Sequence, residues 1–260
     1  MPQSNGEALK HTRHYFGTDG VRGLANQHLT PELALNLAMS AATVLKGNAS
    51  HPRVLIGKDT RQSGDMLESA LASGFASMGW DVELLGVVPT PAVAWLVTQR
   101  QAAMGAMISA SHNPAPDNGI KFFNANGFKL SDEMEANIEV CLTEQKWIRQ
   151  VGSGVGRIHQ LSADAWEPYL NFLLACDLPK FKGLRIAVDL AHGAMVDVAP
   201  AVLNRLGIEV HYLNGAPNGM NINDDCGSTH LEPLRNYVRT HGLDLGIAFD
   251  GDGDRVQMIA

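Results

Sequence analysis

Cysteine, basic charge and long apolar runs are all scarce in this 260-residue sequence. Its three cysteines, Cys141, Cys176 and Cys226, lie far apart and form no Cys-x-x-Cys pair. This argues against a disulfide framework or a zinc site and favours reduced thiols. No run reaches the roughly 18 apolar residues of a membrane span, and residues 1–14 lack the apolar stretch of a signal peptide. We expect a cytoplasmic protein that does not contact a membrane.

Charge excludes a further class of partner. The 20 basic and 27 acidic side chains give a net charge of -7, whereas proteins that bind polyanions normally have a basic excess. We therefore expect no nucleic-acid partner. The composition carries no signal for an oligomeric state. Aromatic residues make up 6% and there are 26 glycines, which favours many tight turns around an aliphatic core.

Short apolar segments alternate with helical periodicity along the chain, a pattern typical of an α/β fold. Strands are expected at 53–57, 82–85, 104–109, 120–123, 184–190, 208–213, 245–249 and 256–259. Helices are expected at 33–45, 66–78, 92–99, 131–147, 196–206 and 231–241. Thr30 and Ser131 have the residue types of helix N-caps, and Gly242 that of a C-terminal stop.

The glycine-rich segment 151–156 lacks periodicity and predicts a linker and hinge. It divides the chain into two similar α/β domains with mixed, mainly parallel sheets, at 12–156 and 157–260. The last expected strand is followed at once by Ala260, so we expect the chain to be part of a longer protein.

The segment Asp250-Gly-Asp252-Gly-Asp254-Arg255 directly follows an expected strand. Carboxylates at i, i+2 and i+4 point to one side of an extended segment, and the glycines allow it to curl. Their oxygens could then converge on a hard divalent ion such as Mg²⁺. An EF-hand loop needs glycine at its sixth position, where Arg255 stands. A solvated acidic turn is the remaining interpretation.

Ser111 and His112 belong to Ile108-Ser-Ala-Ser-His-Asn-Pro114, at the end of an expected strand where ligands bind in open α/β sheets. Adjacent Ser and His side chains do not form a catalytic triad, and no Gly-x-Ser-x-Gly motif is present, which disfavours a serine hydrolase. A serine oxygen beside a divalent metal is better suited to carrying a phosphoryl group. Alternatively, the segment is an Asn-Pro turn with capping serines.

Other polar residues give weaker signals. Arg22 in the glycine-flanked loop 18–23, and the segment Lys58-Asp-Thr-Arg61, could orient a phosphate or form surface ion pairs. Lys121 is close in sequence to the serine and could act as an acid or base. His192 and Gly193 are interpreted as structural. His11, His14 and His28 have no ligand spacing and are expected on the surface.

Five segments, in their order along the chain, resemble the α-D-phosphohexomutase superfamily. Their amino-acid sequences are most similar to those of the bacterial phosphoglucosamine mutase family. These segments are Phe16-Gly-Thr-Asp-Gly-Val-Arg22-Gly, Gly57-Lys-Asp-Thr-Arg61, Ser109-Ala-Ser111-His-Asn-Pro, Asp117-Asn-Gly-Ile-Lys121-Phe-Phe and Asp250-Gly-Asp-Gly-Asp-Arg255. The resemblance covers nearly the whole chain after a short N-terminal extension.

The resemblance implies an isomerase that interconverts glucosamine 6-phosphate and glucosamine 1-phosphate, for amino-sugar metabolism and peptidoglycan precursor synthesis. A phosphoserine would phosphorylate the phosphosugar substrate, giving a bisphosphate intermediate. By the same resemblance Ser111 is the phosphoserine, and Ser111, Asp250, Asp252 and Asp254 hold Mg²⁺. His112 and Lys121 would assist proton movement, and Arg22 and Arg255 would contact the phosphoryl group.

Superfamily members usually have four domains, and the sugar-binding third and phosphate-binding fourth are absent from this chain. We therefore expect little mutase activity from it alone. A phosphomannomutase or phosphoglucomutase of the same superfamily is one alternative, and a non-catalytic metal-binding module is another.

Overall fold

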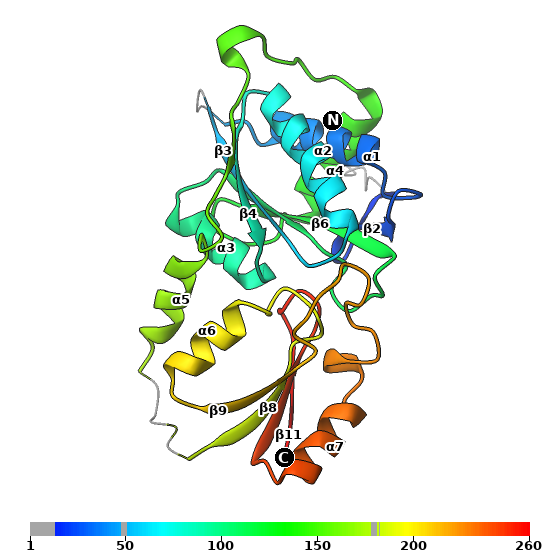
Figure 1. Cartoon of the computed structure of the whole chain (residues 1–260). Coiled ribbons are helices and arrows are strands. Elements are labelled where there is room, and N and C mark those ends of the chain that lie inside the picture. Colours follow the sequence, from blue (N-terminus) through cyan, green and yellow to red (C-terminus); the bar gives the residue numbers. More distant parts are fainter. Residues whose placement is uncertain (1–13, 48–50, 178–180, 182) are drawn as a thin grey trace, which may run out of the picture.

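The computed structural model describes residues 14–47, 51–177, 181 and 183–260 (Figure 1). His11 and the expected domain start at residue 12 lie outside the described residues. The chain forms two α/β domains whose parallel strands direct their carboxyl ends toward the other domain (Figure 1). The predicted α/β class is therefore confirmed. Among the described residues, no helix combines the length and apolar character needed to cross a membrane.

The first domain is built on a seven-stranded mixed sheet. Its spatial order is β1 (Phe16–Gly17), β2 (Gly20–Leu24), β6 (Asp117–Asn124), β5 (Met104–Ile108), β3 (Arg53–Lys58), β4 (Asp81–Val87) and β7 (Ile158–Gln160). The four strands from β5 to β7 are parallel, and β6, β2 and β1 add antiparallel pairs.

Residues 20–23, interpreted from the sequence as part of a loop, belong to strand β2, which pairs with β6. Gly20, at the start of β2, explains both why β2 can pair with β6 and why the sequence did not predict this strand. Gly20 has a φ of 86°, and a Cβ there would stand 2.3 Å from the carbonyl oxygen of Ile120. Only glycine allows the two backbones to approach this closely.

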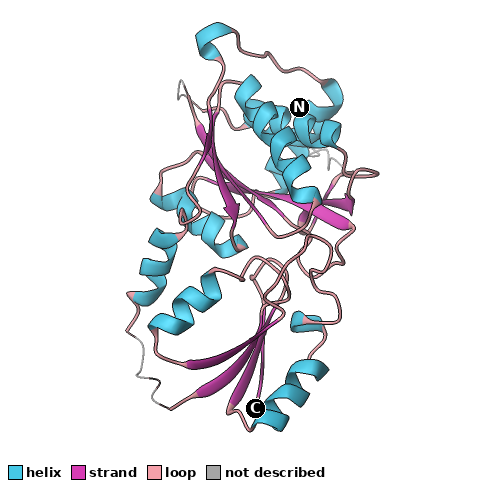
Figure 2. Ribbon diagram, in the orientation of Figure 1, coloured by secondary structure: helices cyan, strands magenta, loops and turns pink. Residues whose placement is uncertain are grey.

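Helices cover both faces of the first sheet (Figure 2). One face packs against α1 (Pro31–Val44), α2 (Ser63–Ser77) and α4 (Asp132–Glu144), and the other against α3 (Thr90–Gln99) and α5 (Glu167–Leu174). The predicted caps are confirmed: Thr30 Oγ1 accepts from the amide of Leu33 at 3.2 Å, and Ser131 Oγ from that of Met134 at 3.3 Å.

Helix α5 was not expected from the sequence. It is held by aromatic stacking rather than by a strong periodic pattern, since Phe172 stacks on Trp95 of α3 with ring centroids 5.0 Å apart. It also packs against α6 (Val198–Arg205) of the second domain.

The second domain has a four-stranded sheet between α6 and α7 (Glu232–His241). Its spatial order is β11 (Val256–Ile259), β10 (Leu245–Phe249), β8 (Arg185–Asp189) and β9 (Glu209–Leu213). Strands β10, β8 and β9 are parallel, and β11 returns antiparallel to β10. Gly242 ends α7 with a φ of 58°, as its residue type predicts.

The segment 151–156 runs along the first domain. The amide of Gly156 donates to the carbonyl of Ala76 at 2.9 Å, and a Cβ at Gly156 would overlap the backbone of Trp80. Strand β7 then joins the first sheet beside β4, past the predicted boundary at residue 156. We propose that the first domain continues through β7 and that α5, which packs on both α3 and α6, lies at the boundary between the domains.

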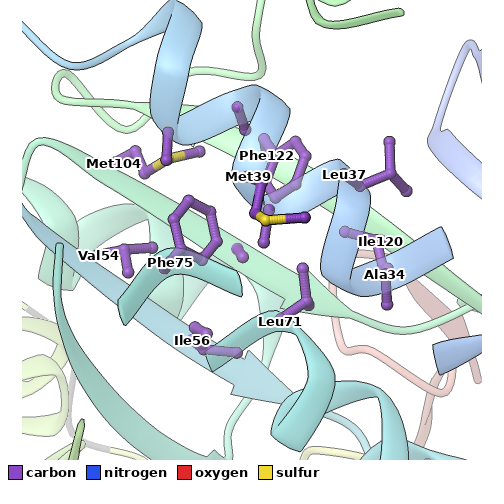
Figure 3. Close-up of a cluster of buried hydrophobic side chains, with 14 of the residues drawn as sticks. Ala34, Leu37, Met39, Val54, Ile56, Leu71, Phe75, Met104, Ile120 and Phe122 are labelled. Atoms are coloured by element: carbon purple, nitrogen blue, oxygen red, sulfur yellow. The ribbon is translucent and has the colours of Figure 1, made fainter. Parts of the chain in front are cut away.

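The largest cluster of buried apolar side chains lies between the first sheet and helices α1, α2 and α4. Phe75 is fully buried at its centre, surrounded by aliphatic side chains of the sheet and of α1 (Figure 3). It also contacts the rings of Trp80 and Phe122 at centroid distances of 5.7 and 6.2 Å. This cluster supports the strands whose ends carry the site described below.

We expect Phe75→Ala to lower the free energy of unfolding by about 3–5 kcal/mol, because it leaves a large cavity in a closed core. Urea unfolding followed by circular dichroism measures the effect. Phe128→Ala is the matched control, since Phe128 is 71% exposed and its truncation leaves no cavity. Equal losses in the two variants would contradict this account of the core.

Candidate active site

Residues 109–116, here called the serine loop, connect the carboxyl end of β5 to β6. Ser111 is 3% exposed and has a φ of 53°, in the left-handed region that residues other than glycine rarely adopt. Its amide donates to Ser109 Oγ at 2.9 Å. Such a conformation persists only where surrounding contacts hold it, and it is frequent at functional sites.

Arg61 supplies much of this support. Its guanidinium is fully buried and pairs with Asp59 at 2.9 Å. It also donates to four main-chain oxygens of the serine loop and the start of β6 at 2.5–3.0 Å, those of Ser111, Asn113, Pro114 and Asp117. Arg61 is thus neither in a surface ion pair nor available to a phosphate, the two roles considered from the sequence.

Asp59 links this guanidinium back to the serine loop. It accepts a 2.5 Å hydrogen bond from Ser109 Oγ, the same oxygen that receives the Ser111 amide. Burial raises the pKa of Asp59, and the adjacent Arg61 charge and the Ser109 hydroxyl oppose that rise. Asp59 and Arg61, which follow the end of β3, thereby set the backbone of a loop about fifty positions further along the chain.

Residues 250–255, here called the acidic turn, follow the carboxyl end of β10 and approach the serine loop from the second domain. One carboxylate oxygen from each of Asp250, Asp252 and Asp254 lies within 4.8 Å of the others. The sequence prediction that these three side chains converge therefore agrees with the geometry. The flanking elements are strands, which excludes an EF-hand.

Ser111 meets this turn directly. Its hydroxyl donates to Asp250 Oδ2 at 2.6 Å, across the boundary between the domains. Arg255 Nη2 donates to Ser111 Oγ at 2.5 Å and to Asp250 Oδ2 at 2.9 Å. The glycine between the first two aspartates permits the approach, because a Cβ on Gly251 would stand 2.5 Å from the Ser111 carbonyl oxygen.

Asp252 is held from the first domain as well. Thr90, at the start of α3, donates from its hydroxyl to Asp252 Oδ2 at 2.6 Å and from its amide to the Asp252 carbonyl at 2.9 Å. The second carboxylate oxygen, Oδ1, is buried and has no hydrogen-bond partner among the described residues. Since buried polar atoms are normally paired, this oxygen suits a bound cation.

The pKa shifts of the clustered aspartates also favour a bound cation. Burial, together with the charges of Asp250 and Asp254, raises the pKa of Asp252 to about 7. Burial also pushes the pKa of Asp250 upward, but hydrogen bonds from Ser111 and the Arg255 amide hold it below its usual range. A cation among these carboxylates would stabilise all three in the charged form. The donor set and its geometry therefore fit a metal ion.

The remaining predicted residues lie around this centre. Lys121 Nζ is 3.7 Å from Asp254 Oδ2. His112 Nδ1 accepts from Arg255 Nη2, and burial with the Arg255 and Arg22 charges lowers the pKa of His112. Arg22 forms an ion pair with Asp19 at 3.4 Å, while its buried Nε has no partner among the described residues.

Two of the weaker signals resolve as structural. Lys58 is engaged by Asp65 and Glu68 at 2.7 and 2.6 Å, so it forms ion pairs rather than a phosphate contact. The His192 carbonyl accepts from Thr60 Oγ1 at 2.5 Å, and a Cβ on Gly193 would stand 2.4 Å from the Gly251 carbonyl oxygen. Of the expected surface histidines, His14 and His28 are exposed.

Sequence reasoning missed Thr90 and Asn223. Thr90 follows Val88-Pro89 at the end of β4, and this position at a strand's carboxyl end was the available signal. Asn223 lies in the irregular stretch 214–226, where no periodicity marks it. Its side chain donates to the carbonyls of Ser111 and Asn113.

We expect Gly251→Ala to lower the free energy of unfolding by about 1–3 kcal/mol, because the new methyl group meets backbone that cannot rotate away. Thermal unfolding followed by calorimetry measures the change. Gly17→Ala is the control, since its Cβ would lie 3.7 Å from the nearest atom, an ordinary contact. A Gly251→Ala chain as stable as the control would show that the two domains do not approach here.

The chain is similar to two family models and to curated proteins. Residues 13–149 match the family model for phosphoglucomutase/phosphomannomutase alpha/beta/alpha domain I, and residues 167–260 match that for domain II. The chain is 51% identical over 245 residues to phosphoglucosamine mutase of Salinispora tropica and 52% identical over 243 residues to that of Rhodococcus opacus. Each match covers 92% of this chain and 54% of the relative.

Solved structures agree with the fold. A phosphoglucomutase/phosphomannomutase family protein of Burkholderia thailandensis superposes with a TM-score of 0.82 at 23% identity, covering 95% of this chain and 54% of that one. The phosphoglucomutase parafusin of Paramecium superposes with a TM-score of 0.74 at 20% identity, covering 95% and 52%. The chain spans about half the length of the curated relatives it matches. Because two family models together cover most of its residues, the chain belongs to the phosphoglucomutase/phosphomannomutase family.

Proposed function

We propose that this chain carries the phosphoserine and metal-binding half of a phosphoglucosamine mutase. The observation that carries the proposal is the 2.6 Å contact between Ser111 Oγ and Asp250 Oδ2, beside three clustered carboxylates. Nucleophile and carboxylates come from different domains, so neither domain alone holds the site. The identity of about 50% to curated phosphoglucosamine mutases supports this branch of the family.

We propose Mg²⁺ as the cation. Asp250, Asp252 and Asp254 would hold it together with an oxygen at Ser111, because carboxylate oxygens are the ligands that Mg²⁺ prefers. Bound there, Mg²⁺ would neutralise negative charge on a phosphoryl group carried by Ser111. Thr90 orients Asp252 so that its second oxygen is available.

The proposed reaction is phosphoryl transfer between Ser111 and a sugar hydroxyl. The bond between phosphorus and Ser111 Oγ breaks and a bond from phosphorus to the sugar oxygen forms. The sugar hydroxyl gives its proton to Lys121, and the leaving Ser111 oxygen takes up a proton, so that the free Ser111 hydroxyl is regenerated. Catalysis of this kind depends mainly on positioning and charge stabilisation. The resulting sugar bisphosphate returns its other phosphoryl group to Ser111, which restores the phosphoserine.

The surrounding side chains suit separate tasks in that transfer. Arg255, adjoining Ser111 Oγ, would contact a phosphoryl oxygen, and the buried Nε of Arg22 would donate a hydrogen bond to a further phosphoryl oxygen. With Nδ1 accepting from Arg255, the neutral ring of His112 carries its proton on Nε2. His112 would thus act as a hydrogen-bond donor, which leaves Lys121 to exchange the hydroxyl proton.

The proposed substrate is glucosamine 6-phosphate, converted to glucosamine 1-phosphate. A phosphomannomutase or phosphoglucomutase would use the same serine and carboxylates, and similarity to curated relatives favours the amino sugar. Because the chain spans about half their length, we expect little complete turnover from it alone. A cytoplasmic location belongs to the same proposal, since all three cysteines are free thiols.

We expect a hexose 1,6-bisphosphate with Mg²⁺ to transfer one phosphoryl group to the chain. Intact-mass spectrometry before and after exposure measures the gain, and peptide mapping locates it. Ser111→Ala should gain nothing, whereas Ser153→Ala, which changes an exposed serine outside the serine loop, should gain the group as the wild-type chain does. Phosphorylation elsewhere, or none in the wild-type chain, would favour a non-catalytic metal-binding module.

Mg²⁺ should also stabilise the folded chain, because it binds the assembled carboxylates and not the unfolded state. At ten times its Kd the expected gain is about 1.4 kcal/mol, seen as a higher Tm. Asp252→Asn should abolish the gain. Asp224→Asn, which changes an exposed carboxylate outside the cluster, should retain it. An equal gain in both variants would mean that the ion binds elsewhere.

A further inference from the structure

Two main-chain oxygens of the serine loop each accept hydrogen bonds from both domains. The carbonyl oxygens of Ser111 and Asn113 receive Arg61 Nη2 of the first domain at 3.0 and 2.9 Å. The same two oxygens receive Asn223 Nδ2 of the second domain at 2.9 and 3.0 Å. Among the described residues, Asn223 is the only side chain of the second domain that hydrogen-bonds the main chain of this loop.

Asn223 is itself held rigidly. Its side chain and backbone are only 8% exposed, and its main-chain N–H donates to the carbonyl of Ala191 at 2.9 Å. Its φ of 58° lies in the left-handed region, where asparagine is among the best-tolerated residues after glycine. A side chain fixed in this way has little freedom to move without its domain.

The side-chain amide of Asn223 also lies next to the acidic turn. A Cβ on Gly251 would stand 2.8 Å from Asn223 Nδ2 and 2.5 Å from the Ser111 carbonyl oxygen, so these three groups are in close contact. A displacement of the acidic turn therefore acts on the Asn223 amide and, through it, on the backbone of Ser111. An aspartate of the same shape could not replace it, because a carboxylate has no hydrogen to donate to a carbonyl.

Arg61 holds the serine loop from within the first domain, whereas Asn223 holds it from the second domain. Arg61 belongs to the same domain as the loop, so its bonds to the loop carbonyls do not require the second domain. Asn223 reaches them only when the second domain, with its acidic turn, lies against the first. The second contact thus adds a requirement for closed domains to the geometry of the serine.

We propose that Asn223 is a positioning residue, through which the second domain sets the backbone of Ser111 for phosphoryl transfer. The catalytic part of this inference rests on the proposed function, and the conformational part does not. In the part of the chain that the structure describes, the Asn223 side chain hydrogen-bonds the loop carbonyls and neither the Ser111 hydroxyl nor the three carboxylates, so its effect passes through those carbonyls.

The test uses two variants and one control in the complete chain. Asn223→Gly keeps the left-handed backbone and removes the amide, and Asn223→Asp keeps the shape and removes the donors. Asn214→Gly is the control, because Asn214 also has a left-handed φ of 52° and, within the described residues, it is Asn223 and not Asn214 whose side chain hydrogen-bonds the serine loop. The measurements are hydrogen exchange of peptides from 109–119 and the rate of Ser111 phosphorylation by a hexose 1,6-bisphosphate with Mg²⁺.

We expect both Asn223 variants to exchange faster at 109–119 than the control, with unchanged exchange in the core strand β3. The phosphorylation rate at saturating bisphosphate should fall about 10- to 100-fold, because a misplaced nucleophile loses alignment. The concentration that gives half the maximal rate should change little. If Asn223 had only a structural role, its variants would lower the Tm without lowering the saturating rate selectively over the concentration that gives half the maximal rate.

Either Asn223 variant with wild-type exchange and wild-type rate would overturn the inference. Asn223→Asp decides the matter if Asn223→Gly fails to fold, since it preserves shape and backbone preference. If the wild-type chain is not phosphorylated at all, the proposed function fails, and exchange at 109–119 still tests the conformational coupling.

Discussion

The site depends on placing the buried carboxylates of one domain against the hydroxyl of another. Asp250 is buried beneath Arg255 and Ser111, and Asp252 is 1% exposed beneath Thr90. Buried carboxylates are costly unless hydrogen bonds or a cation compensate them. Here Arg255 of the same turn compensates Asp250 in part, and the first domain supplies the rest through the hydroxyls of Ser111 and Thr90. The chemistry of the acidic turn therefore also stabilises the contact between the domains.

Backbone atoms carry much of that contact. Gly251 leaves no room for a side chain beside Ser111, and the Thr90 amide, the His192 carbonyl and the carbonyl of Ser111 all bond across the boundary. Main-chain positions vary less than long flexible side chains, so a joint built on them fixes the serine and carboxylates closely. The left-handed conformation of Ser111 is held in turn by the buried Arg61 and Asp59.

The α/β class and most elements could be predicted because apolar periodicity and caps such as Thr30 are local signals. The convergence of Asp250, Asp252 and Asp254 was also predicted from their close spacing, but residues 251–254 form a turn with Gly253 at a φ of 70° rather than the extended segment expected. Strand β2 and helix α5 were missed because a close glycine contact at Gly20 and aromatic stacking on Trp95 are tertiary. Asn223 and the loop-holding role of Arg61 depend on partners far away in sequence, which no local pattern reports.

The central claim is that Ser111 and the acidic turn form one site around a shared cation. A crystal structure of the chain with Mn²⁺ in place of Mg²⁺, analysed by anomalous scattering, tests it most directly. The account predicts an anomalous peak ligated by Asp250, Asp252 and Asp254, with the Ser111 oxygen in the same coordination shell. A peak bound elsewhere, or a Ser111 side chain turned away from an ion held by the aspartates alone, would contradict it.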